Sequence, residues 1–124
     1  MKRTNIVIGT RGSKLATIYA EKVKNELKKH FPNKIELKKI VTTGDQKQDE
    51  RLSKIGGKGL FSTQIEKELI NKSVDIAVHA LKDMPTVETK NLITNNFLKR
   101  NSPNEILISK NNIRFEDLEP DSII

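Results

Sequence analysis

The sequence contains no cysteine and no tryptophan, and only one tyrosine and four phenylalanines among its 124 residues. Without cysteine, these residues can form no disulfide and offer no thiol nucleophile, which fits a reducing compartment. So few aromatic side chains leave little for base stacking, so nucleic-acid binding is disfavoured despite a net charge of +7. Long apolar runs are also missing, which argues against a signal peptide or a membrane span. We therefore expect a cytoplasmic protein with neither a membrane nor a nucleic-acid partner.

The composition allows a modest aliphatic core. Hydrophobic residues make up 35% of the chain and the length suits one domain. The 16 acidic residues are interspersed with the 23 basic ones, so the positive charge is not gathered into a basic tail. Binding of a polyanion is compatible with this charge but is not required by it.

The chain begins with the pattern of a strand followed by a helix. Asn5–Gly9 is short and β-branched, which predicts a buried strand that ends at a glycine. Ser13 is a suitable N-cap for the following helix, and Pro32 ends it. The helix shows one apolar face with a spacing of four, formed by Leu15, Tyr19, Val23, Leu27 and Phe31.

The turn between this strand and this helix offers groups for an anion. Arg11 is a fixed cation, and the N–H groups near Gly12 and Ser13 lie at the positive end of the helix dipole. A carboxylate or a phosphate would suit these groups. An ordinary turn with a solvated arginine is the alternative that spacing alone leaves open.

The middle of the chain predicts a second strand, a polar loop and a second helix. Ile35–Val41 has the strand pattern, whereas residues 42–54 are polar and aperiodic. The acidic residues of that loop lack calcium-ligand spacing, so no metal is inferred. The glycines around Lys58 precede a helix whose apolar face is formed by Phe61, Ile65 and Leu69. They match neither the P-loop nor the dinucleotide fingerprint, which disfavours nucleotide binding.

The stretch Val74–Pro85 predicts a central strand that ends in charges. Its β-branched residues alternate as in a largely covered strand, and Pro85 keeps Met84 out of helical geometry. Lys82 and Asp83 should therefore lie on a turn at the carboxyl end of the strand, where open α/β sheets bind ligands. A solvated surface ion pair is the alternative.

Together these segments predict an α/β fold with a mostly parallel sheet and flanking helices. Further short strands are predicted at residues 92–97 and 105–109, and one helical turn at residues 115–118. A polar, proline-bearing segment at residues 99–103 has the composition of a hinge or crossing between lobes. The apolar end at Ile123 and Ile124 resembles the start of a further strand, so we expect the sequence to be truncated.

Four motifs in sequence order closely resemble the amino-terminal part of the hydroxymethylbilane synthase family, also called porphobilinogen deaminase. They are Gly9–Ala16, Thr43–Asp45, Lys54–Phe61 and Asp75–Pro85. The resemblance covers nearly the whole chain. One local departure is Tyr19, where the family commonly has glutamine.

The resemblance implies a transferase of tetrapyrrole and haem biosynthesis, which polymerises porphobilinogen head to tail into hydroxymethylbilane with release of ammonia. It implies a dipyrromethane cofactor held covalently by a cysteine outside these residues, with porphobilinogen and the growing polypyrrole as partners. The implied fold is a lobe like those of type II periplasmic binding proteins. The first lobe would span residues 1–98, the hinge residues 99–103, and an incomplete second lobe residues 104–124.

By the same resemblance, Asp83 is the expected catalytic residue, because a carboxylate near the pyrrole N–H would stabilise the charge of an electron-poor azafulvene. The expected substrate and cofactor ligands are Arg11, Ser13, Asp45, Lys54, Lys58 and Lys82. His79 could relay protons, but a hydrogen-bonded buried histidine is the favoured reading. The alternative function is a small-anion-binding lobe of periplasmic-receptor type without catalysis, which would not need Asp83.

We expect the whole protein to be a monomer and the isolated chain to be inactive. The cysteine that carries the cofactor is absent from the chain. The isolated chain should also self-associate, since unpaired apolar strands would be exposed at Ile106, Ile108, Ile123 and Ile124.

Overall fold

The computed structural model describes residues 5–46, 59–106 and 108–123. A three-stranded parallel sheet has the order β2-β1-β3, with β1 at Asn5–Arg11, β2 at Lys34–Ile40 and β3 at Ile76–Ala77. The register pairs Asn5 with Lys34 on one side of β1 and Ile8 with Ile76 on the other. The predicted α/β class and parallel strands are confirmed.

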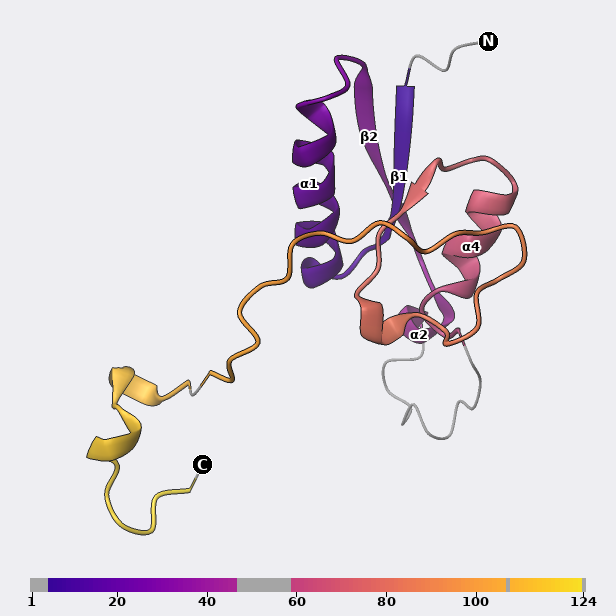
Figure 1. The fold of residues 1–124 in the computed structure, drawn as a ribbon. Helices are drawn as coiled ribbons and strands as arrows, with labels where there is room; N and C mark the ends of the chain where they lie inside the picture. The colour runs from indigo at the N-terminus through magenta and orange to yellow at the C-terminus, as the bar shows by residue number, and fades with distance from the viewer. Residues whose placement is uncertain (1–4, 47–58, 107, 124) are drawn as a thin grey trace.

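Helices cover both faces of this sheet (Figure 1). Helix α1 spans Lys14–Lys28 and helix α4 spans Thr63–Ile70. The single turn α2 at Thr43–Gln46 follows β2, within the loop that the sequence predicted to be without regular structure. Short 3₁₀ turns lie at Leu81–Asp83 (η1), Lys110–Asn112 (η2) and Phe115–Asp117 (η3), and η3 confirms the predicted helical turn.

The core consists of two aliphatic clusters, one on each face of the sheet. Ile8 and Ile35 pack with Ala20 of α1, whereas Ile65 of α4 packs with Ile40 and Val74. Successive side chains of a strand point to opposite faces, so β1 supplies Ile8 to the first cluster and Val7 to the second. The strand thereby joins both clusters.

Helix α1 begins where the sequence predicted. The Oγ of Ser13 accepts a hydrogen bond from the Ala16 N–H at 3.3 Å, which is the geometry of an N-cap. The predicted apolar face is only partly correct, because Leu15 is 53% exposed whereas Ala20 is fully buried. A strict spacing of four drifts around a helix with 3.6 residues per turn, so the ends of the predicted stripe leave the core.

Strand β3 differs from the predicted central strand. It contains two paired residues, and its hydrogen-bonded neighbour within the described sheet is β1, which holds the central position. Asp75, just before β3, accepts a hydrogen bond from the Val7 N–H through Oδ2 at 2.9 Å. Its own N–H donates to the Val7 carbonyl at 2.8 Å. The side chain therefore completes the pairing of β1 where the short strand has not yet begun.

We call residues 93–106 and 108–123 the C-terminal segment, and its later part, orange to yellow, extends away from the sheet (Figure 1). The strand predicted at residues 92–97 is wrong, and the described residues of the one predicted at 105–109 are not in a strand either. We call the described residues up to 92 the N-terminal lobe. Within the described residues, no helix is long and apolar enough to cross a membrane.

Candidate functional site

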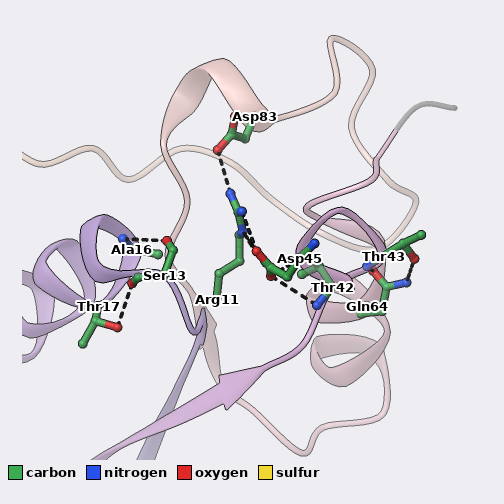
Figure 2. Close-up of polar contacts among 9 residues, drawn as sticks. All are labelled: Arg11, Ser13, Ala16, Thr17, Thr42, Thr43, Asp45, Gln64 and Asp83. Atoms are coloured by element: carbon green, nitrogen blue, oxygen red, sulfur yellow. Dashed lines mark hydrogen bonds and ion pairs between the residues drawn. The ribbon is translucent and has the colours of Figure 1, made fainter. Parts of the chain in front are cut away.

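The candidate site lies where β1 and β3 end, as predicted for an open parallel sheet. Arg11 is the last residue of β1. Asp45 lies in α2, which follows β2, and Asp83 lies in η1, which follows β3. Figure 2 shows Arg11 between the two aspartates. Three segments distant in sequence thus bring two carboxylates to one guanidinium.

Arg11 binds Asp45 through two of its nitrogens. Nη2 donates to Oδ1 at 2.6 Å, and Nε donates to Oδ1 and Oδ2 at 3.1 and 3.3 Å. The third nitrogen, Nη1, lies 3.6 Å from the Asp83 carboxylate. The three side chains are only 15 to 22% exposed, so solvent screens these contacts less than those of a surface pair. The predicted site cation is therefore paired with two carboxylates that the same chain supplies.

Thr42 completes the surroundings of Asp45. Its hydroxyl donates to Asp45 Oδ2 at 2.7 Å, and its backbone N–H lies 3.3 Å from the same oxygen. Partial burial raises the pKa of Asp45, but the hydrogen bonds from Arg11 and Thr42 lower it by more, and the pKa lies below its ordinary value. Asp45 is therefore a fixed carboxylate at neutral pH.

Ser13 is predicted as a ligand, but its hydroxyl oxygen accepts the N-capping hydrogen bond of α1 (Figure 2). The residue is half-buried at the turn after β1. Its O–H can still donate to a ligand while the oxygen accepts from Ala16. Ser13 thus orders the helix start and presents one donor there.

Lys82 and Asp83 occupy η1, and Met84 has the extended backbone that Pro85 was expected to impose, with φ −81° and ψ 143°. Lys82 is exposed, whereas Asp83 is half-buried and turned toward Arg11. The structure does not have the alternative predicted above, a solvated ion pair between Lys82 and Asp83, because Asp83 pairs with Arg11.

His79 is half-buried, and its Nε2 is a buried atom that has no hydrogen-bond partner among the described residues. The favoured prediction, a buried histidine whose ring is hydrogen-bonded, is therefore wrong for Nε2. Burial lowers the pKa of His79, the charges of Glu66 and Asp83 oppose the shift, and Arg11 adds to it. The net direction is downward, so the imidazole is neutral at neutral pH.

Two predicted ligands, Lys54 and Lys58, lie outside the described residues. Phe61 was not predicted as a site residue, because its spacing assigned it to the apolar face of a helix. Its ring instead lies under the Arg11 guanidinium, with a centroid 3.9 Å from Cζ. Phe61 comes two residues before α4 begins, and that offset is the signal that could have separated it from the helix face.

Among the described residues, no group of three His, Cys, Asp or Glu side chains is placed to hold a metal ion. The donors that the site presents are instead suited to carboxylates: exposed Lys82, the Ser13 hydroxyl and the start of α1. The acceptors, Asp45 and Asp83, are suited to N–H groups or to a developing positive charge. The site can therefore bind a ligand that carries both carboxylates and an N–H.

Comparisons with known proteins agree with these features. A family model described as "Porphobilinogen deaminase, dipyromethane cofactor binding domain" matches residues 6–124. The curated porphobilinogen deaminase of Chlorobium chlorochromatii is 45% identical over 121 residues, which are 97% of this chain and 39% of that protein. The one from Geobacillus kaustophilus is 46% identical with the same coverage. The chain thus spans about two fifths of the length of the curated relatives it matches.

Proposed function

Because the chain belongs to the porphobilinogen deaminase family, we propose that the whole protein joins porphobilinogen units head to tail into hydroxymethylbilane and releases ammonia at each step. The observation that carries this proposal is the placement of Asp83. Its carboxylate lies at the carboxyl end of β3, half-buried, and 3.6 Å from a guanidinium that is itself fixed on Asp45. Such a carboxylate suits a substrate that becomes positively charged as it reacts.

The role proposed for Asp83 follows from charge. When ammonia leaves porphobilinogen, positive charge develops on the pyrrole ring, and a preorganised carboxylate near the ring N–H stabilises it. Arg11 Nη1, 3.6 Å away, holds this carboxylate in place. His79, neutral and with an Nε2 that no described residue hydrogen-bonds, is the proposed proton relay beside it.

The dipyrromethane cofactor named in the family model fits the donors described above. It carries acetate and propionate carboxylates, for which we propose Lys82, Ser13 and the N–H groups at the start of α1 as ligands, with Lys54 and Lys58 from outside the described residues. When bound, it supplies the pyrrole carbon to which the first porphobilinogen is joined. Its attachment requires a cysteine beyond these 124 residues, which contain none.

The alternative function, capture of a small anion without catalysis, is less well supported. Arg11 would be the main anion ligand in such a lobe, but it already faces two carboxylates of the chain. A carboxylate beside a bound anion is unfavourable, whereas it is useful beside a developing cation. The geometry therefore favours the deaminase reaction.

The central test is Asp83→Asn in the whole protein, since this change removes the charge and keeps the shape. We expect turnover of porphobilinogen to fall on the order of a hundredfold or more. Cofactor attachment, measured by mass spectrometry, should be retained. Asp117→Asn, an exposed carboxylate in η3, is the matched control. Wild-type turnover in Asp83→Asn would contradict the proposal.

A second test separates ligand binding from stability. Lys82 is exposed on η1, so Lys82→Ala should weaken the binding of carboxylated pyrroles with little change in thermal unfolding. Lys90→Ala, also exposed, is the control. A sharp fall in unfolding temperature with unchanged affinity would show that Lys82 is structural.

We also propose the domain limits expected from the sequence: a first lobe at residues 1–98, a hinge at 99–103 and part of a second lobe from 104 onward. The strands that the structure describes, together with α1 and α4, all precede residue 93, which supports this division. Limited proteolysis of the isolated chain should cut first within 99–103. Preferred cleavage between α1 and β2 would contradict the division.

The isolated chain is proposed to be inactive and to self-associate, whereas the whole protein is proposed to be a cytoplasmic monomer. Ile106 and Ile108 are 83% and 91% exposed, and Ile123 is fully exposed. Ile124 lies outside the described residues. Sedimentation at micromolar concentrations should show association, which Ile106→Lys with Ile108→Lys should abolish. A monomeric wild-type chain would refute self-association, and cell fractionation tests the location.

A further inference from the structure

Phe61 forms one wall of the Arg11 site. Its ring centroid lies 3.9 Å from Arg11 Cζ, so one face of the guanidinium is stacked on the ring. Nε and Nη2 point to Asp45 and Nη1 points to Asp83. A ring packed against this face opposes tilting of the guanidinium plane out of line with Asp83.

The ring occupies this position because residue 44 is glycine. A Cβ built on Gly44 would lie 2.1 to 2.6 Å from three carbons of the Phe61 ring, closer than real Cβ atoms approach their neighbours. Gly44 is itself buried. Any side chain at position 44 would displace the ring from its place beneath Arg11. The Thr-Gly-Asp motif thus supplies both the glycine against which the ring packs and Asp45, the carboxylate that binds Arg11.

The two turns that carry these residues are fastened together. The Gly44 N–H donates to the Leu60 carbonyl at 2.9 Å. The Gln64 amide donates to Thr43 Oγ1 at 2.5 Å and accepts from the Thr43 N–H at 3.4 Å (Figure 2). Three hydrogen bonds therefore fix the start of α4 against α2, which holds the Phe61 backbone in register with Asp45.

We propose that Phe61, seated on Gly44, is a positioning residue that holds the Arg11 guanidinium in the plane between Asp45 and Asp83. It acts through Arg11 and does not need to touch the ligand. The arrangement of the three charged groups follows from contacts within the chain alone. A consequence for turnover rests in addition on the proposed function, because it requires Asp83 to act on porphobilinogen.

The test uses the full 124-residue chain with Ile106→Lys and Ile108→Lys, the two changes expected to abolish self-association. It follows the NMR signal of the Arg11 Nε–H, assigned by its loss in Arg11→Lys. A guanidinium held on Asp45 and Phe61 gives a resolved, slowly exchanging signal. Phe61→Leu removes the aromatic face, so we expect the hydrogen-exchange rate of this group to rise about tenfold, in keeping with the strength of a partly desolvated cation–π contact.

Gly44→Ala is the second variant, and it keeps the ring but removes its seat. It should raise the Nε–H exchange rate to a similar extent. The double variant, Phe61→Leu with Gly44→Ala, should exchange only slightly faster than the faster single variant, because both changes break the same contact between Arg11 and the Phe61 ring. Phe61→Met, which refills irregular space, takes the place of Phe61→Leu if the latter fails to fold. Folding is judged by the backbone amide signals of β1.

Ile65→Val is the matched control, since Ile65 is fully buried nearby and its truncation weakens the lobe without touching Arg11. The control should leave the Nε–H signal unchanged. An unchanged signal in both folded variants at positions 61 and 44, or an equal change in Ile65→Val, would overturn the inference. These outcomes are independent of catalysis, which Asp83→Asn tests separately in the whole protein.

Discussion

The N-terminal lobe and the C-terminal segment contain similar apolar triplets with different outcomes. Ile6-Val7-Ile8 lies in β1, with β2 on one side and β3 on the other. In the C-terminal segment, Ile106 and Ile108 stand on either side of a residue outside the described ones, and both are almost fully exposed. β-Branched residues therefore form a strand where neighbouring strands accept from their N–H groups and donate to their C=O groups.

The largest effect should separate a buried isoleucine of the lobe from an exposed one of the segment. Ile65 is 0% exposed and Ile108 is 91% exposed. Ile65→Ala should lower the free energy of unfolding by about 2 to 5 kcal/mol, because it leaves a cavity. Ile108→Ala should change it by less than about 0.5 kcal/mol. Urea denaturation measures both, and equal losses would show that the segment belongs to the folded core.

A smaller difference is expected between two aspartates. Asp75→Ala removes the carboxylate that accepts from the Val7 N–H, so it should lower the free energy of unfolding by about 1 to 3 kcal/mol. Asp117→Ala in the segment should have almost no effect, since the side chain is exposed. The same denaturation assay compares them. If Asp75→Ala left the free energy of unfolding unchanged, water would be taking the place of the carboxylate as the acceptor for the Val7 N–H.

Two serines with local hydrogen bonds give the next comparison. Ser13 accepts from the Ala16 N–H, and Ser122 donates to the Glu119 carbonyl at 2.7 Å. Ser13→Ala should cost about 1 kcal/mol, the usual effect of losing an N-cap. Ser122→Ala should leave the unfolding midpoint of the lobe unchanged. A matching loss at both positions would mean that the segment unfolds together with the lobe.

The sequence predicted what depends on neighbours along the chain. Three predictions rest on local patterns: the N-cap at Ser13, the extended Met84 before Pro85 and the strand that begins at Asn5. The structure has each of them, although the strand continues past the predicted end at Gly9 to Arg11. Strand partners are not local. The strands predicted at residues 92–97 and 105–109 are therefore not found among the described residues, and β3 is shorter than its pattern predicted. A segment's own residues do not show how many neighbouring strands are available to pair with it.

The site shows the same limit. Arg11, Asp45 and Asp83 were each predicted as site residues, but their mutual contacts were not, because they bring together residues 34 positions or more apart. Phe61 was assigned to a helix face by spacing, although its ring lies against Gly44 of another motif. The residues next to Gly44 in the sequence do not indicate that the Phe61 ring packs against it.

The smallest effect concerns pH. The pKa of Asp45 is below its ordinary value in the folded lobe, so the unfolded chain binds more protons as the solution is acidified. The stability that Asp45 contributes is therefore complete above the unfolded pKa, about 4, and is lost as the pH falls toward the folded value. Asp45→Asn should lose less stability than the wild type between pH 5 and 2.5, measured by urea denaturation. Asp117→Asn, the control, should follow the wild type.

The position of β1 in the middle of the sheet has a consequence for how the protein is made. During translation, β1 leaves the ribosome first and can pair with β2 across the local connection through α1. Its other edge must wait for Asp75 and β3, 68 residues later along the chain. Since long-range pairing slows folding, we expect the second half of the sheet to be the late and slow step. Until then, Val7 and its hydrogen-bonding groups remain open to other nascent chains.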